Sequence, residues 1–356
     1  MAKKKESLMT AVSAEMKSSF NLDKFKEKKL LNNPVKFKEQ KWIPFSEALQ
    51  DSTSLPGAAI GHINLLRGHS NTGKTTALLE LAINAQKMGI LPVFIITEMK
   101  WSWEHAKQMG FEIQDVVDES TGEVIDYKGF FLYNDRSSLN TIEDVAEFIA
   151  DLLDEQKKGN LPYDLLFLWD SIGSIPCKMS IEKNSNSPMW NAGAMSQQFA
   201  NFINQRLIMS RKESQAYTNT MLCVNKVWVE PALMPMAQPK LRNKGGDSMF
   251  FDASFIITFG NVTSPGTQKV KATKNGKEIE FALKTKVSCD KNHVTGVTAK
   301  GTIVSTAHGF IKNSPNEINK YKKEHSKNWA SILGSDDFDI VEEENLDFLG
   351  VDTSEI

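Results

Sequence analysis

Hydrophobic and polar residues follow two different periods along this chain, and these periods predict strands and helices in alternation. Four continuous apolar runs are typical of strands that are buried on both faces: residues 63–68, 91–98, 164–171 and 220–228. Residues 77–89 and 141–159 instead carry apolar positions at helical spacing, and each segment ends in glycine, a common helix stop. Apolar strands separated by helices predict a parallel sheet that helices cover on both faces.

The pattern changes towards the C-terminus, where strand-like segments follow one another without long helical segments between them. Residues 255–260, 277–288 and 301–306 predict antiparallel strands that continue the same sheet. Residues 313–334 are expected to form a final helix. The chain is therefore predicted to have an α/β fold, with a mostly parallel central sheet that is extended by antiparallel strands.

Both ends of the chain differ in charge from the core, which is expected at residues 42–312. Residues 1–41 are rich in lysine and are expected to form a basic arm or oligomerisation element. Residues 335–356 carry nine acidic side chains and no basic one, and we expect an acidic disordered tail there. The other residues carry 42 basic and 35 acidic side chains, an excess that the net charge of −2 conceals. A basic body with an acidic tail is common in proteins that bind nucleic acid, although a solubilising tail explains the charge equally well.

The composition also argues against several classes of protein. The N-terminal lysines are followed by no apolar segment, so we expect no signal peptide, and no apolar run approaches the roughly 20 residues of a membrane helix. Cys177, Cys223 and Cys289 are far apart and lack the spacing of a zinc site. Scattered cysteines suit a reducing compartment, and we therefore expect a cytoplasmic protein without a membrane partner.

Residues 67–82, RGHSNTGKTTALLELA, contain the phosphate-binding pattern Gly-x4-Gly-Lys-Thr. The pattern lies between an apolar strand and a helix, so that backbone N–H groups and the positive end of the helix can face a phosphate. Nine residues are expected to surround the phosphates: Gly68, His69, Ser70, Asn71, Thr72, Gly73, Lys74, Thr75 and Thr76. Lys74 is expected to contact the β- and γ-phosphates, and Thr75 to bind Mg²⁺.

Two acidic residues follow apolar strands and are candidates to complete this site. Asp170 follows the run LLFLW and is expected to support the metal from a neighbouring strand, although an acid at such a position can also cap a turn. Glu98 ends the strand expected beside the loop and can polarise the water that attacks the γ-phosphate. The alternative for Glu98 is a residue at the start of a helix.

Taken in order, six segments resemble the core of the RecA-type strand-exchange recombinases: GHSNTGKTT, VFIITE, LFLWDSIGS, AMSQQFANFINQRL, LCVNKVW and NKGGDSMFFDAS. Within that family they are most similar to the UvsX-like proteins of phages, over about residues 42–288. The resemblance implies a RecA-like phosphate-loop ATPase core that binds ATP and Mg²⁺. It implies a DNA-dependent ATPase that forms filaments on single-stranded DNA and exchanges strands with homologous duplex DNA. It also implies a bacterial cytoplasm, in a phage-infected cell, and contacts with loader and single-strand-binding proteins.

The resemblance implies roles for the residues of the nucleotide site. The family's phosphate-binding, metal-binding and water-activating residues match Lys74, Thr75, Asp170 and Glu98. The γ-phosphate sensor corresponds to Asn225 and Lys226, and Lys226 replaces the glutamine of many family members with a point charge. The expected nucleotide-stacking tyrosine is absent, and either His105, at that spacing, or the nearby Trp103 is expected to cover the adenine.

The resemblance also places two DNA-binding loops, at residues 179–195 and 229–246. The second loop ends in a glycine pair, Gly245 and Gly246. Its three prolines block regular structure, and three basic residues suit the backbone of a single DNA strand: Lys240, Arg242 and Lys244. In the first loop Met189 and Trp190 can stack on bases, although an aromatic residue near a helix start more often packs against the protein.

Three further features concern contacts between copies of the chain. Phe251 matches a phenylalanine that the family places across the subunit interface. Lys284 and Lys286 match lysines that reach a neighbouring subunit's ATP, and two residues this far apart on a strand point to one face. Without the resemblance, a solvated strand face is the simpler interpretation. Phe25 is a candidate anchor between subunits, or equally a phenylalanine in a flexible tail.

Two other functions are compatible with a phosphate loop. One is a hexameric replicative helicase of the DnaB type, against which Ser171, the glycine pair and the lack of a separate N-terminal helical domain argue. The other is a RecA-like regulator that binds nucleotide without moving DNA, against which the basic loops argue. The three functions predict different assemblies on single-stranded DNA, namely filaments, closed rings and none.

Overall fold

The computed structural model describes residues 20–29, 35–185, 187–230, 240–243, 246–261, 266–274 and 277–329, and its contacts divide the chain into the units Met1–Lys38 and Glu39–Ile356. In the first unit, helix α2 (Leu22–Lys28) begins after Asn21, whose side chain accepts a hydrogen bond from the backbone N–H of Lys24 at 2.9 Å. The predicted acidic tail and residues 1–19 lie outside the described part of the chain.

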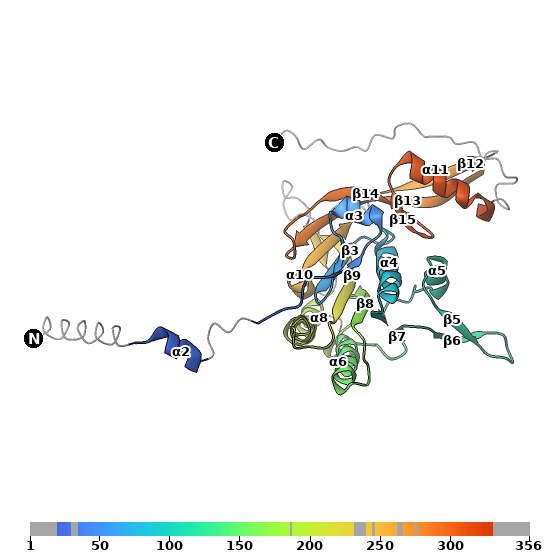
Figure 1. Cartoon of the computed structure of the whole chain (residues 1–356). Coiled ribbons are helices and arrows are strands. Elements are labelled where there is room, and N and C mark those ends of the chain that lie inside the picture. Colours follow the sequence, from blue (N-terminus) through green and yellow to red (C-terminus); the bar gives the residue numbers. More distant parts are fainter. Residues whose placement is uncertain are drawn as a thin grey trace, which may run out of the picture. The chain divides into compact units, whose positions relative to one another are not determined.

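The second unit is built on one large mixed sheet, in which the described residues form eleven strands (Figure 1). Six parallel strands lie in the order β11-β3-β9-β8-β4-β7. They are β3 (Ile63–Gly68), β4 (Leu91–Ile96), β7 (Leu132–Asp135), β8 (Leu165–Ile172), β9 (Thr220–Glu230) and β11 (Phe255–Phe259). The antiparallel strands are β10 (Lys240–Asn243), which pairs with β9, and, beyond β11, β12 (Thr267–Lys274), β13 (Lys277–Asn292), β14 (Lys300–Thr306) and β15 (Gly309–Lys312). An α/β fold with a mixed sheet is thereby confirmed.

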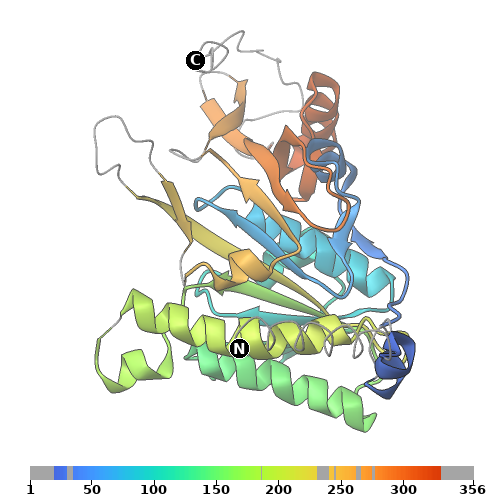
Figure 2. The same cartoon turned by 90° about the vertical axis from the view of Figure 1, so that its left-hand side faces the viewer.

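Helices cover both faces of this sheet. In β4, Phe94 and Ile96 join one hydrophobic core while Val93 and Ile95 join another, because alternate residues of a strand point to opposite faces. The first core includes residues of α3 (Glu47–Thr53), α4 (Lys74–Lys87) and α5 (Trp103–Gln108). The second includes residues of α6 (Ile142–Lys158), α8 (Pro188–Met195), the π-helix η1 (Ser196–Ile203), α9 (Asn204–Met209) and α10 (Ser248–Asp252). Figure 2 shows α6 beside the continuous run from α8 to α9 along this face.

Local sequence signals set the ends of α6. The Thr141 side chain accepts the Asp144 N–H at 3.1 Å, and the Asp144 carboxylate accepts the Thr141 N–H at 2.8 Å. Gly159 follows the last turn with φ 86, a left-handed conformation that ends helices. The remaining strands form two small sheets, β1 (Trp42–Pro44) with β2 (Gly57–Ala59) and β5 (Gln114–Val117) with β6 (Val124–Lys128).

Three sequence predictions differ from the structure. β11 runs parallel to β3, although an antiparallel strand is predicted there, because a short apolar run carries no signal for strand direction. The segment 179–195, predicted to be a loop, is largely helical: it contains most of α7 (Lys178–Glu182) and all of α8 (Pro188–Met195). The final helix α11 (Pro315–Glu324) ends well before residue 334, at His325, whose ring stacks on that of His308 with 4.0 Å between centroids. A short 3-10 helix, η2 (Ser326–Trp329), follows it.

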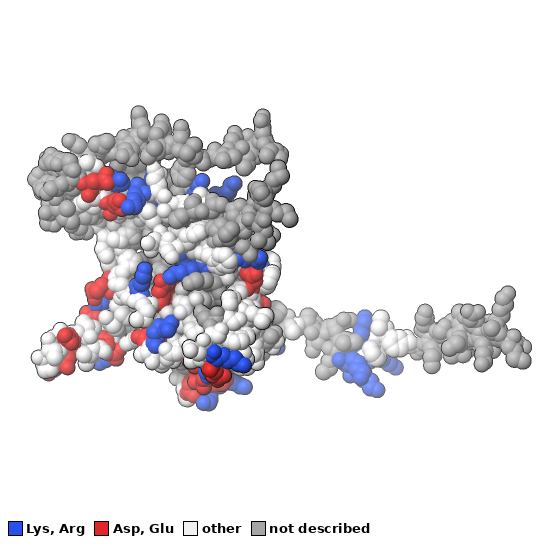
Figure 3. All heavy atoms as spheres, turned by 180° about the vertical axis from the view of Figure 1, so that it is seen from behind, with Lys and Arg blue, Asp and Glu red and all other residues white. Residues whose placement is uncertain are grey.

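Charged side chains of both signs are interspersed over the face seen in Figure 3. Among the residues coloured there, basic side chains occur in small groups and not as one continuous surface. In the described ranges, no helix combines the length and apolar character needed to cross a membrane.

Candidate nucleotide-binding site

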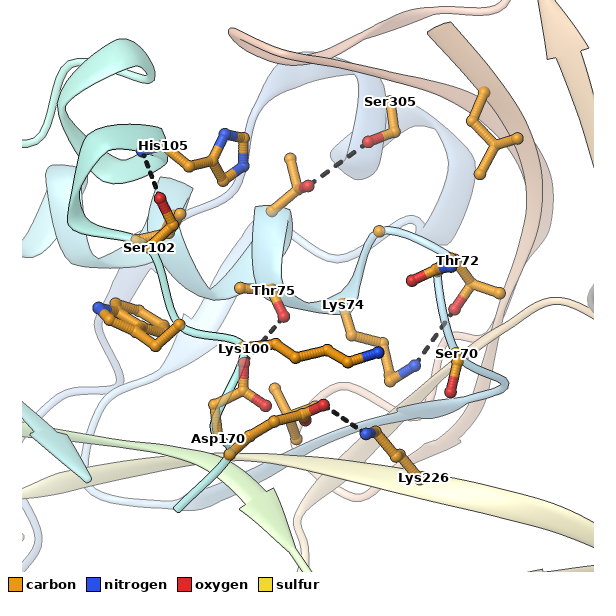
Figure 4. A pocket seen from close by; sticks show the side chains of 18 residues that line it. Ser70, Thr72, Lys74, Thr75, Lys100, Ser102, His105, Asp170, Lys226 and Ser305 are labelled. Carbon is orange, nitrogen blue, oxygen red and sulfur yellow. Dashed lines mark hydrogen bonds and ion pairs between the residues drawn. The ribbon is translucent and has the colours of Figure 1, made fainter. Parts of the chain in front are cut away.

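A cavity of about 440 Å³ opens at the carboxyl ends of the parallel strands, where ligands commonly bind in open α/β sheets (Figure 4). Residues 70–76 of the predicted phosphate loop line it, and Gly68 and His69 lead into this segment. Four other predicted residues also line it: Glu98, His105, Asp170 and Lys226. The fold therefore brings together groups that lie far apart in the sequence.

Glycines set the path of the chain from β3 into α4. Gly68 has φ 153, and a Cβ atom there would lie 2.2 Å from the carbonyl oxygen of Phe259. Gly73 precedes α4 with φ 98, a left-handed conformation that favours glycine. α4 consequently begins at the cavity, and the N–H groups of its first turn, which have no partner within the helix, are suited to bind an anion.

Lys74 is almost fully enclosed by this loop. Its ammonium donates hydrogen bonds to the carbonyl oxygen of His69 and, at 3.3 Å, to the Thr72 hydroxyl. Burial lowers the pKa of Lys74 to about 8, while the carboxylate of Asp170 acts in the opposite direction. A bound polyphosphate would supply the negative charge that this buried ammonium lacks.

Thr75 and Asp170 meet at the mouth of the loop. The Thr75 hydroxyl donates a hydrogen bond to Asp170 Oδ2 at 2.8 Å, while Oδ1 is buried and has no partner among the described residues. Burial raises the pKa of Asp170 to about 6, which means that the ionised carboxylate is short of compensating charge. A hydroxyl and a carboxylate oxygen fit Mg²⁺, which takes few protein ligands and completes its shell with phosphates and water.

The structure corrects the expected positions of both acids. β9 lies between β3 and β8, and β4 lies beyond β8, so neither Asp170 nor Glu98 comes from a strand next to β3. Asp170 lies inside β8, and Glu98 follows β4 without starting a helix. The carboxyl ends of parallel strands share one edge of the sheet, and both acids therefore still line the cavity.

Glu98 has an ion-pair partner that the sequence did not reveal. Lys226 Nζ lies 2.5 Å from Glu98 Oε1, and the Ser171 hydroxyl donates to Glu98 Oε2 at 3.4 Å. Lys226 comes from β9, the strand between the phosphate-loop strand and the Asp170 strand. Asn225, its neighbour in β9, is buried and points to the opposite face of the sheet. Of the two predicted sensor residues, only Lys226 therefore lines the cavity.

The far end of the cavity is suited to a base, and His105 lines it from α5. Burial lowers the pKa of His105, which favours the neutral imidazole, and an imidazole can stack on an aromatic ring. Trp103, the alternative, packs in the core with its ring centroid 5.3 Å from that of Phe94. Trp101, which sequence reasoning overlooked, lines the cavity, and its indole Nε1 has no hydrogen-bond partner in the described chain.

The two lysines of β13 point away from the cavity of their own chain. Leu283 lines the cavity, and Thr285 and Val287, two and four residues further along the strand, are buried. Lys284 and Lys286 alternate with these residues and therefore face the opposite side of the sheet, as their spacing predicts.

The predicted second DNA loop is partly a β-hairpin. Residues 240–243 form β10 and pair with β9, so the basic residues Lys240 and Arg242 lie on a strand and not in an irregular loop. Arg242 lies opposite Trp228, and both side chains are exposed, Trp228 to 47%. Trp228 was missed, although its position two residues after Lys226 places it on the same face of β9. Residues 231–239, Lys244 and Gly245 lie outside the described part of the chain.

The two predicted DNA segments contact each other through Gly246. A Cβ atom at Gly246, which has φ 89, would lie 2.7 Å from the Cβ atom of Ala192 in α8. In α8, Met189 is 77% exposed and available for a ligand. Trp190 instead packs partly against the core, and Lys183 Nζ lies 6.0 Å from its ring centroid. Of these two side chains, Met189 is the better candidate for a contact with bases.

The two predicted interface phenylalanines are both accessible. Phe251, in α10, is 72% exposed. Its neighbour Phe250 lies beneath the Arg67 guanidinium, with 4.9 Å between the guanidinium carbon and the ring centroid. Phe25, in α2, is 40% exposed and contacts Phe20 with 5.4 Å between ring centroids. Exposed phenylalanines of this kind are suited to contacts with another protein surface.

Comparison with known proteins yields no relative: no protein-family model matches this chain, and no curated protein sequence is significantly similar to it. The function therefore has to be inferred from the cavity and its surroundings. The strongest features are the phosphate loop, the Thr75–Asp170 contact and the Glu98–Lys226 pair.

Proposed function

We propose that this protein is an ATP-dependent DNA recombinase with a RecA-like phosphate-loop ATPase core. The observation that carries the proposal is the hydrogen bond from Thr75 to Asp170 beside the phosphate loop, which leaves one carboxylate oxygen for another partner. This arrangement supports binding of Mg·ATP. The DNA part of the proposal is supported by the exposed Trp228 and Arg242 of the β9–β10 hairpin.

In the proposed reaction the residues of the chain bind the phosphates, orient a water molecule and accept its proton. N–H groups of the loop and of α4 hold the β-phosphate, and Lys74 balances the charge between the β- and γ-phosphates. Mg²⁺, held by Thr75 and supported by Asp170, would neutralise phosphate oxygens. Glu98 orients a water molecule for attack on the γ-phosphorus and takes its proton. Positioning and charge stabilisation account for most of the catalysis in phosphoryl transfer.

The proposal places each active site between two copies of the chain in a filament. Lys284 and Lys286 face away from their own cavity and would reach the γ-phosphate of a neighbour, as an arginine finger does, with a gain of roughly 10³–10⁵ in rate. The exposed Phe251 would lie at the same contact. ATP would favour the filament on single-stranded DNA, in which homologous duplex DNA is paired, and hydrolysis would release it.

Electron microscopy of the protein with single-stranded DNA, Mg²⁺ and a slowly hydrolysed ATP analogue tests this proposal. We expect continuous helical filaments. Closed six-membered rings would instead identify a hexameric helicase of the DnaB type, and bare DNA would identify a nucleotide-binding regulator. A matched preparation of Lys74→Ala, which lacks the phosphate-loop ammonium, is expected to form no filaments.

Rates of ATP hydrolysis provide a second test of the same proposal. Single-stranded DNA is expected to raise the rate of the wild-type protein, because the filament completes the site with lysines from the next copy. An unchanged rate would contradict the recombinase function. Loader and single-strand-binding proteins, the partners expected for a phage recombinase, are then expected to change how fast the stimulated rate is reached.

A further inference from the structure

Each oxygen of the Glu98 carboxylate accepts a hydrogen bond within the cavity. Its Oε1 accepts from Lys226 at 2.5 Å, and its Oε2 accepts from the Ser171 hydroxyl at 3.4 Å. The side chains of Lys226 and Glu98 are 30% and 21% exposed, so solvent only partly screens this ion pair. The ion pair with Lys226 fixes the orientation of this carboxylate, so Glu98 cannot turn towards an attacking water molecule while the pair is in place.

The ammonium of Lys226 also lies close to the position expected for the phosphates. Lys226 lines the cavity with Lys74 and Lys100, and Figure 4 shows all three side chains reaching into it. Burial is the main cause of the lowered pKa of Lys74, Asp170 acts in the opposite direction, and the charge of Lys226 lowers the pKa further by a smaller amount. The two ammonium groups thus interact with each other across the phosphate site.

We propose that Lys226 is a positioning residue that exchanges partners when a triphosphate binds. With the γ-phosphate position empty, its ammonium holds Glu98; when a γ-phosphate arrives, the ammonium moves to it and releases the carboxylate. The γ-phosphate carries more negative charge than one carboxylate and is the stronger partner. A lysine can make this exchange by rotating its long side chain, because its ammonium is a point charge without directional geometry.

This inference rests on the proposed ATPase function and adds a control to it. In the hydrolysis step the water oxygen bonds to the γ-phosphorus and the bond from phosphorus to the β–γ bridging oxygen breaks. ADP keeps that oxygen and its electron pair, and the water proton passes to Glu98 and then to the released phosphate. Because Glu98 is held until a γ-phosphate is present, the site distinguishes ATP from ADP before any chemistry occurs.

Calorimetric titration with ADP and with a non-hydrolysed ATP analogue, in Mg²⁺, tests the exchange in the full-length chain. Lys226→Met is expected to bind the analogue about tenfold more weakly, the loss of one charge-assisted hydrogen bond, and to bind ADP within about twofold of wild type. Lys226→Arg, which keeps the charge, is expected to retain the preference for the analogue. Lys269→Met, which removes the surface ion pair to Glu280 at 2.7 Å, is the matched control and is expected to change neither affinity.

A double-mutant cycle with Glu98→Gln measures the contribution of the Lys226–Glu98 ion pair to nucleotide binding. If binding breaks the Lys226–Glu98 pair, Glu98→Gln strengthens analogue binding about fivefold more in the wild-type background than in the Lys226→Met background. Additive effects, or equal losses of ADP and analogue affinity in Lys226→Met, would overturn the exchange. A wild-type protein that binds neither nucleotide would instead contradict the proposed function, so the two failures are distinguishable.

Discussion

Two buried carboxylates around α4 show how burial changes the cost of ionising a single residue. Asp170 Oδ2 is satisfied by Thr75, while its second oxygen has no partner in the described chain. Glu80, in α4, accepts the Phe310 N–H at 2.7 Å through Oε1, and Ser46 near the carboxylate only partly offsets the effect of its burial. Both carboxylates are therefore costly to ionise. Asp170 has a ligand to compensate it in the proposed function, whereas Glu80 has none.

Thr75→Val tests the metal site at this scale. Valine keeps the shape of threonine but removes the hydroxyl that bonds Asp170, so we expect Mg²⁺-dependent binding of the ATP analogue to fall by at least about tenfold. Titration with and without Mg²⁺ measures the effect. Thr273→Val, on the exposed part of β12, is the control and is expected to change nothing. Equal affinities of Thr75→Val and wild type would argue against a metal at this position.

Glu80→Gln tests how much the ionisation of the buried Glu80 carboxylate lowers the free energy of unfolding. Burial raises the pKa of Glu80 from its usual 4.5 to about 7 in the folded chain. Below pH 4.5 the group is protonated in both states; as pH rises to about 7 the unfolded chain loses the proton first, so folding becomes less favourable. We expect Glu80→Gln, which keeps the acceptor for Phe310, to raise the free energy of unfolding above pH 7 by up to about 3 kcal/mol.

Urea unfolding between pH 4.5 and pH 8 provides the measurement for Glu80→Gln. The gain in stability should grow across this range and vanish at its acid end. Glu324→Gln, on the exposed surface of α11, is the control and should show no such trend. A Glu80→Gln variant whose stability parallels that of wild type at every pH would contradict the expectation.

At the scale of elements, β9 connects the cavity with the proposed DNA contact. Lys226 faces the cavity, Trp228 lies two residues further on the same face, and Arg242 of β10 lies opposite Trp228. The strand itself is predictable from its apolar run. The hairpin is not, because three prolines within residues 229–246 favour an irregular loop and the pairing of β10 depends on residues beyond them.

The β9–β10 hairpin leads to a prediction about single-stranded DNA. Trp228→Ala is expected to weaken binding by roughly 5- to 100-fold through lost base stacking, with little change in salt dependence. Arg242→Gln is expected to weaken binding and to reduce the slope of log affinity against log salt by about 0.7, the share of one phosphate contact. Fluorescence anisotropy at several salt concentrations measures both. Lys300→Gln, exposed on β14, is the control, and equal losses in all three variants would contradict a specific role for the hairpin.

At the scale of the whole molecule, the orientation of β13 in the sheet determines which nucleotide Lys284 and Lys286 could reach. Leu283 lines the cavity, and alternate residues of a strand point to opposite faces. Lys284 and Lys286 therefore lie on the face of β13 that points away from the cavity. Such lysines cannot act on a nucleotide in their own chain without a large rearrangement. In the proposed recombinase they would act on a second copy, and the assembly would then be the functional unit.

Mixing two inactive variants tests this arrangement. Glu98→Gln lacks the carboxylate that takes the proton of the water but keeps the phosphate loop and the β13 lysines, whereas the double variant Lys284→Ala/Lys286→Ala keeps Glu98. In a random one-to-one mixture on single-stranded DNA, about one contact in four combines both intact halves, so we expect about a quarter of the wild-type ATPase rate. A mixture no more active than its separate components would show that the lysines do not act across copies.

Features that depend on neighbouring residues could be predicted without knowledge of the fold. Gly73, which precedes α4, and the capping residues of α6 act within a few positions, so their effect can be read directly from the chain. The apolar runs likewise located five of the six parallel strands, although β11 was predicted to be antiparallel, because burial on both faces needs only a continuous hydrophobic segment. The sixth, β7, is short and only partly buried, and its pattern does not distinguish it from a loop.

The order of the strands and the partners of the charged groups became known from the folded chain alone. The Lys226–Glu98 pair joins residues 128 positions apart, and nothing local to either residue selects the other. The same holds for Trp103, whose neighbours in the core come from several elements, and for the orientation of Lys284 and Lys286. Local propensity acts over a few residues, whereas these features depend on how the sheet assembles, where strand neighbours are set by the packing of the whole core.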